Sequence, residues 1–165
     1  MPVTTARAKL RAELSQRLIP VLLTKGYRGP SELKGNALVH EYRRSTAQGT
    51  QVLEIQLEKY QLLRFVINLY AEPPGGIQSL TQSGGTIISG RLKARRGATT
   101  RSWFRADRSW WERMILRRRD TLEKEAVELC LSLLPEVDAW WTSQTASPHI
   151  SSWPVNYVSQ SAAGI

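Results

Sequence analysis

The chain of 165 residues carries a formal net charge of +9, is 41% hydrophobic and contains one cysteine. This length suits one domain with a buried core, and the composition is that of an ordinary soluble globular protein. No apolar run approaches the ~20 residues that span a bilayer, the first residues lack a signal-peptide pattern, and Cys130 has no partner for an internal disulfide, so we expect a cytoplasmic protein in which Cys130 is a small buried hydrophobe.

The first expected element is a helix over residues 5–25, in which leucines recur at helical spacing. Thr5 is placed to cap this helix, and Gly26 is placed to end it. Pro20 lies inside the pattern and predicts either a kink or a second short helix that starts near Ile19. The recurring leucines are Leu10, Leu14, Leu18 and Leu22.

Strands are expected over residues 37–44, 51–59 and 63–70. The second and third alternate between apolar and polar residues, which predicts an antiparallel sheet with one buried and one polar face. Residues 77–90 are rich in Ser, Thr, Gln and Gly and predict a flexible loop or an edge hairpin. A fourth strand is expected over residues 87–93.

The pattern becomes helical again from Ser109. A capping-box pattern at Asp120 and Glu123 predicts that a second helix starts there and runs to about Leu134. Pro135 is expected to close or kink that helix, and a final half-turn is expected to follow it.

These elements predict a single α+β domain over residues 1–143, with an N-terminal helix and C-terminal helices packed on one face of an antiparallel sheet of about four strands. Residues 144–165 form an uncharged tail that is either extended or disordered. The predicted core is Leu14, Leu18, Leu22, Leu53, Ile55, Leu57, Phe65, Ile67, Leu69, Trp111, Ile115, Leu122, Ala126 and Leu133.

A set of short motifs follows the same order as the predicted elements. The motifs are Lys25-Gly26-Tyr27, Glu54-Ile55-Gln56, Phe65-Val66-Ile67-Asn68-Leu69, Arg95-Arg96-Gly97 and Trp110-Trp111. Their order and spacing, over residues 10–141, resemble a bacterial family catalogued as domain of unknown function 4304. The resemblance implies an α+β fold and no defined chemistry. Small bacterial domains of this build are often immunity or accessory proteins that bind one partner, an analogy at the level of the fold.

No catalytic or metal-binding pattern stands out. The two histidines are His40 and His149, and the neighbour Glu41 points to the opposite face of its strand from His40, so the two cannot form a dyad. One cysteine and two distant histidines do not make a zinc site, and Gly75-Gly76 and Gly84-Gly85 lack the lysine of a phosphate-binding loop. We therefore expect no enzyme activity, no metal and no cofactor.

The strongest functional signal is a basic segment, residues 91–119. It contains eleven Lys or Arg and two acids, and so it carries the whole net charge, while the other 136 residues are neutral. Arginine and aromatic residues anchor protein interfaces, and they also neutralise phosphates and stack on bases. The predicted partner-binding residues are Arg95, Arg96, Arg101, Trp103, Phe104, Arg105, Arg108, Trp110, Arg113, Arg117, Arg118 and Arg119.

We therefore expect a non-enzymatic bacterial interaction protein that binds an acidic macromolecular partner, most simply an acidic protein, through this basic surface, as an immunity-like inhibitor or an accessory subunit. The alternative is an RNA or single-stranded DNA binding protein that uses the same surface. A third hypothesis gives the role to the tail, where Trp153 and Tyr157 would enter a partner's groove or add a strand to its sheet. A further hypothesis is that the basic face contacts only solvent. No membrane partner is expected.

Overall fold

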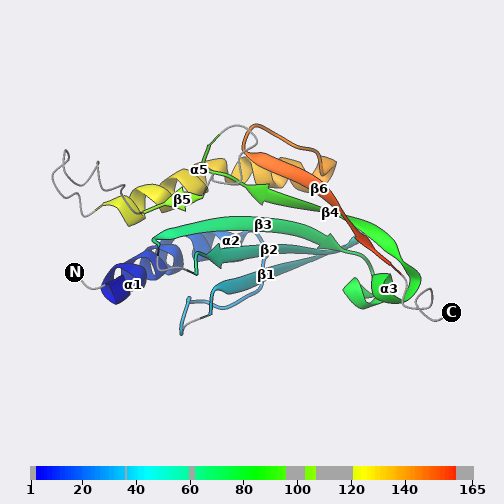
Figure 1. Cartoon of the computed structure of the whole chain (residues 1–165), viewed down its shortest axis with the longest axis horizontal. Helices are drawn as coiled ribbons and strands as arrows, with labels where there is room; N and C mark the ends of the chain where they lie inside the picture. The colour runs from blue at the N-terminus through cyan, green and yellow to red at the C-terminus, as the bar shows by residue number, and fades with distance from the viewer. Residues whose placement is uncertain (1–2, 36, 60–61, 96–102, 107–120, 159–165) are drawn as a thin grey trace.

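The structure is a computed structural model that describes residues 3–35, 37–59, 62–95, 103–106 and 121–158. It has an α+β fold, as predicted, in which the long helices pack on one face of an antiparallel sheet (Figure 1). The strand order is β1-β2-β3-β4-β6, and β5 pairs with β3. Among the described residues, no helix is both long enough and apolar enough to cross a membrane.

The strands are β1 (Val39–Thr46), β2 (Gly49–Leu57), β3 (Arg64–Glu72), β4 (Gly85–Leu92), β5 (Phe104–Arg105) and β6 (Ile150–Tyr157). The first four confirm the four predicted strands, each within two residues at both ends. The alternation also predicts the correct faces, because Ile55 pairs with Ile67 on the buried face while Glu54 pairs with Asn68 on the polar face.

The N-terminal helical stretch bends through one π-helical turn. Its three parts are α1 (Val3–Glu13), η1 (Leu14–Leu18) and α2 (Ile19–Thr24). The N–H of Ile19 donates to the carbonyl of Leu14, five residues back. Pro20 has no N–H and its ring crowds the carbonyl four residues back, so a wider turn before it relieves the clash. The second short helix therefore begins at Ile19, as predicted, whereas Thr5 lies inside α1 and does not cap it.

Gly26 ends α2 as predicted. Its φ of +85° is left-handed, and its N–H donates to the carbonyl of Leu23 at 3.0 Å. The next N–H, of Tyr27, donates to the carbonyl of Leu22 at 3.1 Å. This pair of bonds is a Schellman motif, which satisfies carbonyls that the helix end would otherwise leave free.

A short helix, α3 (Gly76–Ser83), lies where a loop or hairpin was expected, and that expectation was wrong. Its hydroxyl side chains bond to the helix backbone, as Ser79 does to the Gly76 carbonyl at 2.7 Å. Leu80 packs so closely on Gly85 that a Cβ there would lie 2.6 Å from it. This contact with the start of β4 stabilises the segment as a helix, although its composition alone predicts a loop.

The last described helix, α5 (Leu122–Ser143), is a continuous helix of 22 residues. Of the two effects expected of Pro135, closing or kinking the helix near Leu134, the first is wrong because the helix continues to Ser143. Pro135 is exposed, while Val137 and Trp140 beyond it are buried in the core. Burial of these side chains offsets the cost of a proline inside a helix, about 3 kcal/mol. The helix expected from Ser109 lies outside the described residues.

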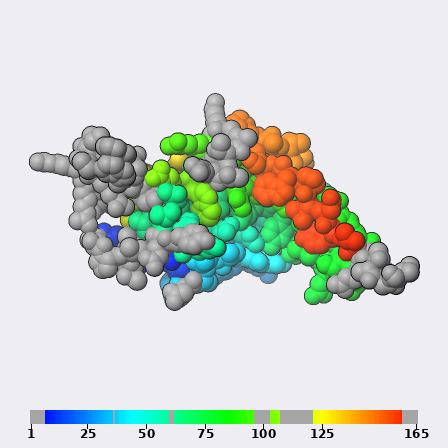
Figure 2. Space-filling model, viewed as in Figure 1, coloured from blue at the N-terminus to red at the C-terminus, as the bar shows by residue number. Residues whose placement is uncertain are grey.

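Part of the uncharged tail belongs to the sheet. Residues Ile150–Tyr157 form β6 and pair with β4 along its whole length, from Ile150 opposite Leu92 to Tyr157 opposite Gly85. Figure 2 shows β6 exposed along one side of the molecule. Residues 159–165 lie outside the described residues.

The core forms between the helices and the inner face of the sheet. Leu122 and Leu133 are partly buried against it, and Trp111 and Ile115 lie outside the described residues. Cys130 is fully buried, as predicted, and burial raises the pKa of its thiol. The predicted core residues confirmed as buried are Leu14, Leu18, Leu22, Leu53, Ile55, Leu57, Phe65, Ile67, Leu69 and Ala126.

Candidate partner-binding surface

The structure describes two pieces of the basic segment, residues 91–95 and 103–106. Arg95 and Arg105 are exposed, Trp103 is half-buried, and Lys93 is buried. Apart from Phe104, which is described below, the other predicted contact residues lie outside the described part of the chain. These are Arg96, Arg101, Arg108, Trp110, Arg113, Arg117, Arg118 and Arg119.

Each of the two described pieces of the basic segment contains residues that pair with the same strand, β3. Arg91 of β4 pairs with Asn68, and Arg105 of β5 pairs with Arg64. Residues four apart in a strand share a face and lie roughly 13 Å apart. Directly paired residues also project from the same face. The register therefore places Arg64, Arg91 and Arg105 on the polar face of the sheet, although Arg91 and Arg105 are distant in sequence from Arg64.

Arg91 is held in place by a chain of contacts across three strands. Its Nε donates to Asn68 Oδ1 at 2.9 Å, and Asn68 Nδ2 donates to Gln56 Oε1 at 2.9 Å. The guanidinium also lies over the ring of Trp153, 5.9 Å from its centroid, in a cation–π contact. Trp153 is 38% exposed. This Arg91–Trp153 pair adds an ordered aromatic and a base to the face. The sequence alone does not connect these two residues, because only the β4–β6 register brings them together.

Phe104 is predicted to anchor a partner, but its position in the structure contradicts that prediction. Its ring is fully buried and stacks on Phe65, with the centroids 4.9 Å apart and an angle of 18° between the ring planes. A side chain packed in the core cannot also insert into a partner. Its neighbour Trp103, just before β5, is partly accessible.

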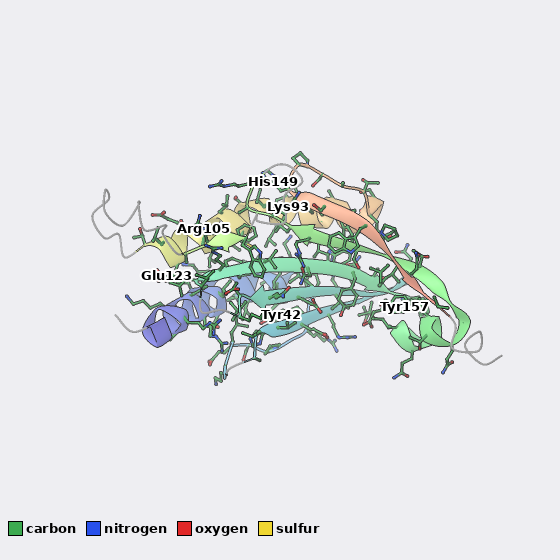
Figure 3. All side chains as sticks on the ribbon, in the orientation of Figure 1. Tyr42, Lys93, Arg105, Glu123, His149 and Tyr157 are labelled. Carbon is green, nitrogen blue, oxygen red and sulfur yellow. The ribbon has the colours of Figure 1, made fainter. Side chains whose placement is uncertain are left out.

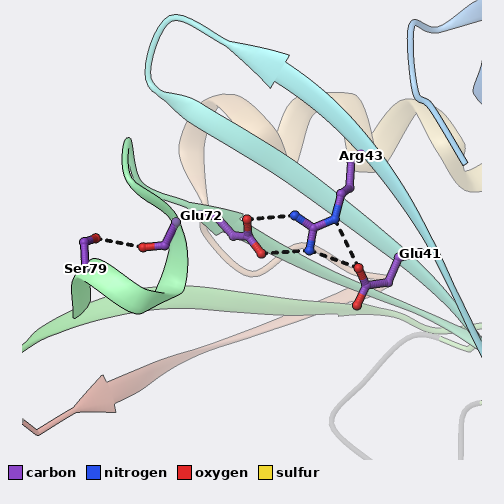
Figure 4. A network of polar contacts seen from close by, with 5 residues as sticks. Glu41, Arg43, Glu72 and Ser79 are labelled. Atoms are coloured by element: carbon purple, nitrogen blue, oxygen red, sulfur yellow. Dashed lines mark hydrogen bonds and ion pairs between the residues drawn. The ribbon is translucent and has the colours of Figure 1, made fainter. Parts of the chain in front are cut away.

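The half of the polar face built by β1, β2 and β3 is rich in carboxylates (Figure 4). Arg43 makes a bidentate ion pair with Glu72, through N–O distances of 2.9 and 3.1 Å, and also donates to Glu41 Oε2 at 3.0 Å. The bond with Glu72 raises the pKa of Arg43 above its ordinary value. Glu54 lies on the same face, near Asn68. The polar face is therefore divided, with carboxylates toward β1 and bases toward β4 and β5.

The two histidines occupy separate places. His40 is buried on the inner face, and His149 lies near Lys93 where β4 meets β6 (Figure 3). His149 Nδ1 lies 2.5 Å from Glu136 Oε1. Burial tends to raise the pKa of Glu136, but hydrogen bonds from Ser147 and His149 outweigh it, so that the pKa is lowered.

This carboxylate–imidazole pair was not predicted, because Glu136 lies on a helix thirteen residues before His149. The Ser147 hydroxyl donates to Glu136 at 2.6 Å and not to the imidazole. The contact between a nucleophile and its base, which nucleophilic catalysis requires, is therefore not made by Ser147. In the part of the chain that the structure describes, no group of three or more His, Cys, Asp or Glu is arranged to hold a metal ion.

Comparisons with protein-family models, with curated proteins and with solved structures found no match. The resemblance to the bacterial family of unknown function therefore stays a prediction, and any functional assignment has to rest on this chain's own residues.

Proposed function

We propose that this chain is a non-enzymatic interaction protein that binds an acidic protein through the basic segment, residues 91–119. The observation that carries the proposal is the confinement of the whole +9 charge to that segment. Such a concentration steers an acidic partner toward one side of the molecule. The β3 register supports it, because the described arginines Arg91 and Arg105 lie with Arg64 along one line of the polar face.

Two features favour a protein over a nucleic acid. A nucleic acid carries a regular line of phosphates, and the carboxylates Glu41, Glu54 and Glu72 would repel that line where it crossed β1 to β3. Burial of Phe104 also removes one of the aromatics that would stack on bases. A folded acidic protein can contact the basic side alone, with Trp103 and Trp153 as partly exposed aromatics at its rim.

The resemblance noted in the sequence adds a narrower form of the proposal. It suggests a bacterial cytoplasmic protein that acts as an immunity-like inhibitor or as an accessory subunit. Both roles need one stoichiometric partner, and neither needs a cofactor.

The test is an affinity pull-down of the tagged protein from its host lysate, with and without nuclease, for three forms of the chain. The first is unaltered. The second is Arg117→Ala/Arg118→Ala/Arg119→Ala, which lowers the net charge from +9 to about +6 inside the segment. The third is Lys9→Ala/Lys34→Ala/Lys124→Ala, which removes the same charge from exposed positions elsewhere.

We expect a stoichiometric acidic protein that survives nuclease, is lost from the segment variant and is retained by the control. A partner that disappears with nuclease would replace the proposal with the nucleic-acid alternative. Equal retention by both variants would show that the basic segment is not the binding site.

A further inference from the structure

Arg7 and Arg11 lie one turn apart on α1, and within the described residues their side chains donate only to backbone carbonyls. Arg7 donates to the carbonyl of Glu58, and Arg11 donates to the carbonyls of Gly35 and Ala37, the latter at 2.8 Å. Neither guanidinium makes an ion pair with any carboxylate of the described chain. Carbonyls supply partial charge, so two neighbouring full positive charges remain without a counter-charge.

The arrangement is costly because Arg11 is buried. Arg11 is 9% exposed, and its buried Nε has no hydrogen-bond partner in the described part of the chain. Desolvation is the largest cause of its lowered pKa, and the adjacent Arg7 lowers it further. A buried cation is stable when an anion pairs with it, and leaving it unpaired costs several kcal/mol in general.

His40 also has a buried nitrogen without a partner among the described residues, and it lies near Arg11 because both side chains bond to the Ala37 backbone. His40, on the inner face of β1, is 8% exposed, and no described residue hydrogen-bonds to its buried Nε2. Burial lowers the pKa of His40, Arg11 lowers it further, and the Ala37 backbone partly offsets both. Opposite His40 on β2 is Ile55, which does not titrate. The lowered pKa of His40 thus has burial as its largest cause, with the Ala37 backbone and Arg11 acting in opposite directions.

We propose that Arg7, Arg11 and His40 form a binding site for a small tetrahedral oxyanion of the sulfate or phosphate type. The set contains two guanidiniums and an imidazole and no carboxylate, which suits an anion and disfavours a metal cation. The free N–H of Arg11 Nε and unused N–H groups of half-buried Arg7 are the donors. His40 adds another when its ring is protonated. The burial of Arg11 and His40 restricts the ligand to a small one.

Proton linkage gives this site a signature. Sulfate stays a dianion between pH 5.5 and 8, so any change in its affinity over that range comes from the protein. Bound sulfate favours protonated His40, because the ring then donates a hydrogen bond to it and carries the opposite charge. The affinity for sulfate should therefore fall as the pH rises, and this site does not depend on the proposed function of residues 91–119.

The experiment is isothermal titration calorimetry of the full chain with sodium sulfate, at ionic strength held constant with sodium chloride, at pH 5.5 and pH 8. We expect saturable binding that is tighter at pH 5.5. Arg7→Gln should weaken it about tenfold, as expected for loss of a charge-assisted hydrogen bond. His40→Gln should abolish the difference between the two pH values. Arg7 is the principal test site because Arg11 also holds residues 35 and 37, so that its replacement threatens folding.

The matched control is Arg17→Gln. Arg17 lies in the same helical stretch and is paired with Glu13 and Glu128, so its replacement should leave sulfate binding unchanged. Circular dichroism confirms that each variant is folded. The proposal is overturned if no saturable sulfate signal rises above the chloride background, as when a water molecule satisfies both buried nitrogens. Equal affinity in the Arg7→Gln variant and the unaltered chain also overturns it.

Discussion

The indole of Trp140 on α5 lies directly against Gly90 on β4. A Cβ at Gly90 would lie 2.8 Å from two carbons of the indole. The indole Nε1 also donates to Ser152 Oγ of β6 at 2.5 Å. One buried side chain of the helix thus contacts two neighbouring strands, and the absence of a side chain at Gly90 is what lets the helix approach the sheet so closely.

Gly90→Ala should therefore lower the free energy of unfolding by about 1–3 kcal/mol, the usual cost of overpacking a core. The sign is informative, because Gly→Ala in a strand without such a contact is neutral or stabilising. Urea unfolding followed by Trp fluorescence measures the change. Ser89→Ala is the control, since Ser89 lies next to Gly90 on the opposite face of β4. A Gly90→Ala protein as stable as the control would show that α5 does not pack here as described.

The edge strand β6 carries a proline at the position that limits further strand pairing. Lys93 N–H donates to the His149 carbonyl at 2.7 Å, and hydrogen-bonded pairs alternate along an antiparallel ladder. The backbone groups of Ser152, Pro154 and Asn156 therefore face away from β4, toward the edge of the described sheet. Pro154 removes the central donor of that edge, a known protection against strand addition.

Pro154→Thr should restore the donor and promote self-association through β6. Analytical ultracentrifugation over a range of protein concentrations should show a larger share of dimers or higher species than the unaltered chain shows. Pro148→Thr is the matched control, because Pro148 is also exposed but lies in the connection before the strand. The same sedimentation profile for both variants would contradict this role for Pro154.

Substitutions of Phe104 distinguish a role in the core from a role in partner binding. Because its ring is buried against Phe65, Phe104→Ala should lower the free energy of unfolding by about 3 kcal/mol or more. Phe104→Leu keeps most of the volume and should cost less than about 1.5 kcal/mol. Chemical denaturation of the two variants measures the difference. A Phe104→Ala protein with unchanged stability and impaired partner binding would restore Phe104 as an anchor.

The sequence predicts the parts of the fold that have a local period. Strict alternation sets the faces of β2 and β3, and the glycine after α2 sets its end. The continuation of α5 past Pro135 cannot be predicted locally, because it depends on the burial of Val137 and Trp140. The strand β6 cannot be predicted from local sequence either. Its residues show no alternation, and pairing with β4 makes them a strand.

The candidate surface also combines features that the sequence predicts with features that depend on tertiary contacts. The concentration of charge in residues 91–119 is visible in the sequence. The sequence does not tell which of the adjacent aromatics, Trp103 and Phe104, is buried, since that depends on which face of β5 meets the core. The contact of Arg91 with Trp153 depends on a strand register that joins residues more than sixty positions apart.

Glu136 stabilises the connection between α5 and β6, because it accepts hydrogen bonds from the Ser147 hydroxyl, the backbone N–H of His149 and the His149 ring. Its pKa is lowered from an ordinary value of 4.5, despite the opposing effect of burial. A carboxyl group whose pKa is lower in the folded state than in the unfolded state stabilises the folded protein at any pH above the ordinary pKa of the carboxyl. That stabilisation is lost as the pH falls below 4.5 and through the folded-state value.

Glu136→Gln should therefore lower the free energy of unfolding by roughly 1 kcal/mol at pH 7, and the difference from the unaltered protein should shrink below pH 4.5. Urea unfolding at a series of pH values from 7 to 3 measures both quantities. Glu128→Gln is the control on the same helix, because Glu128 is half-exposed and its ion pair with Arg17 contributes little. A Glu136→Gln effect that persists undiminished at pH 3 would mean that the side chain acts through packing, and that its charge and the hydrogen bonds to it do not stabilise the α5–β6 connection.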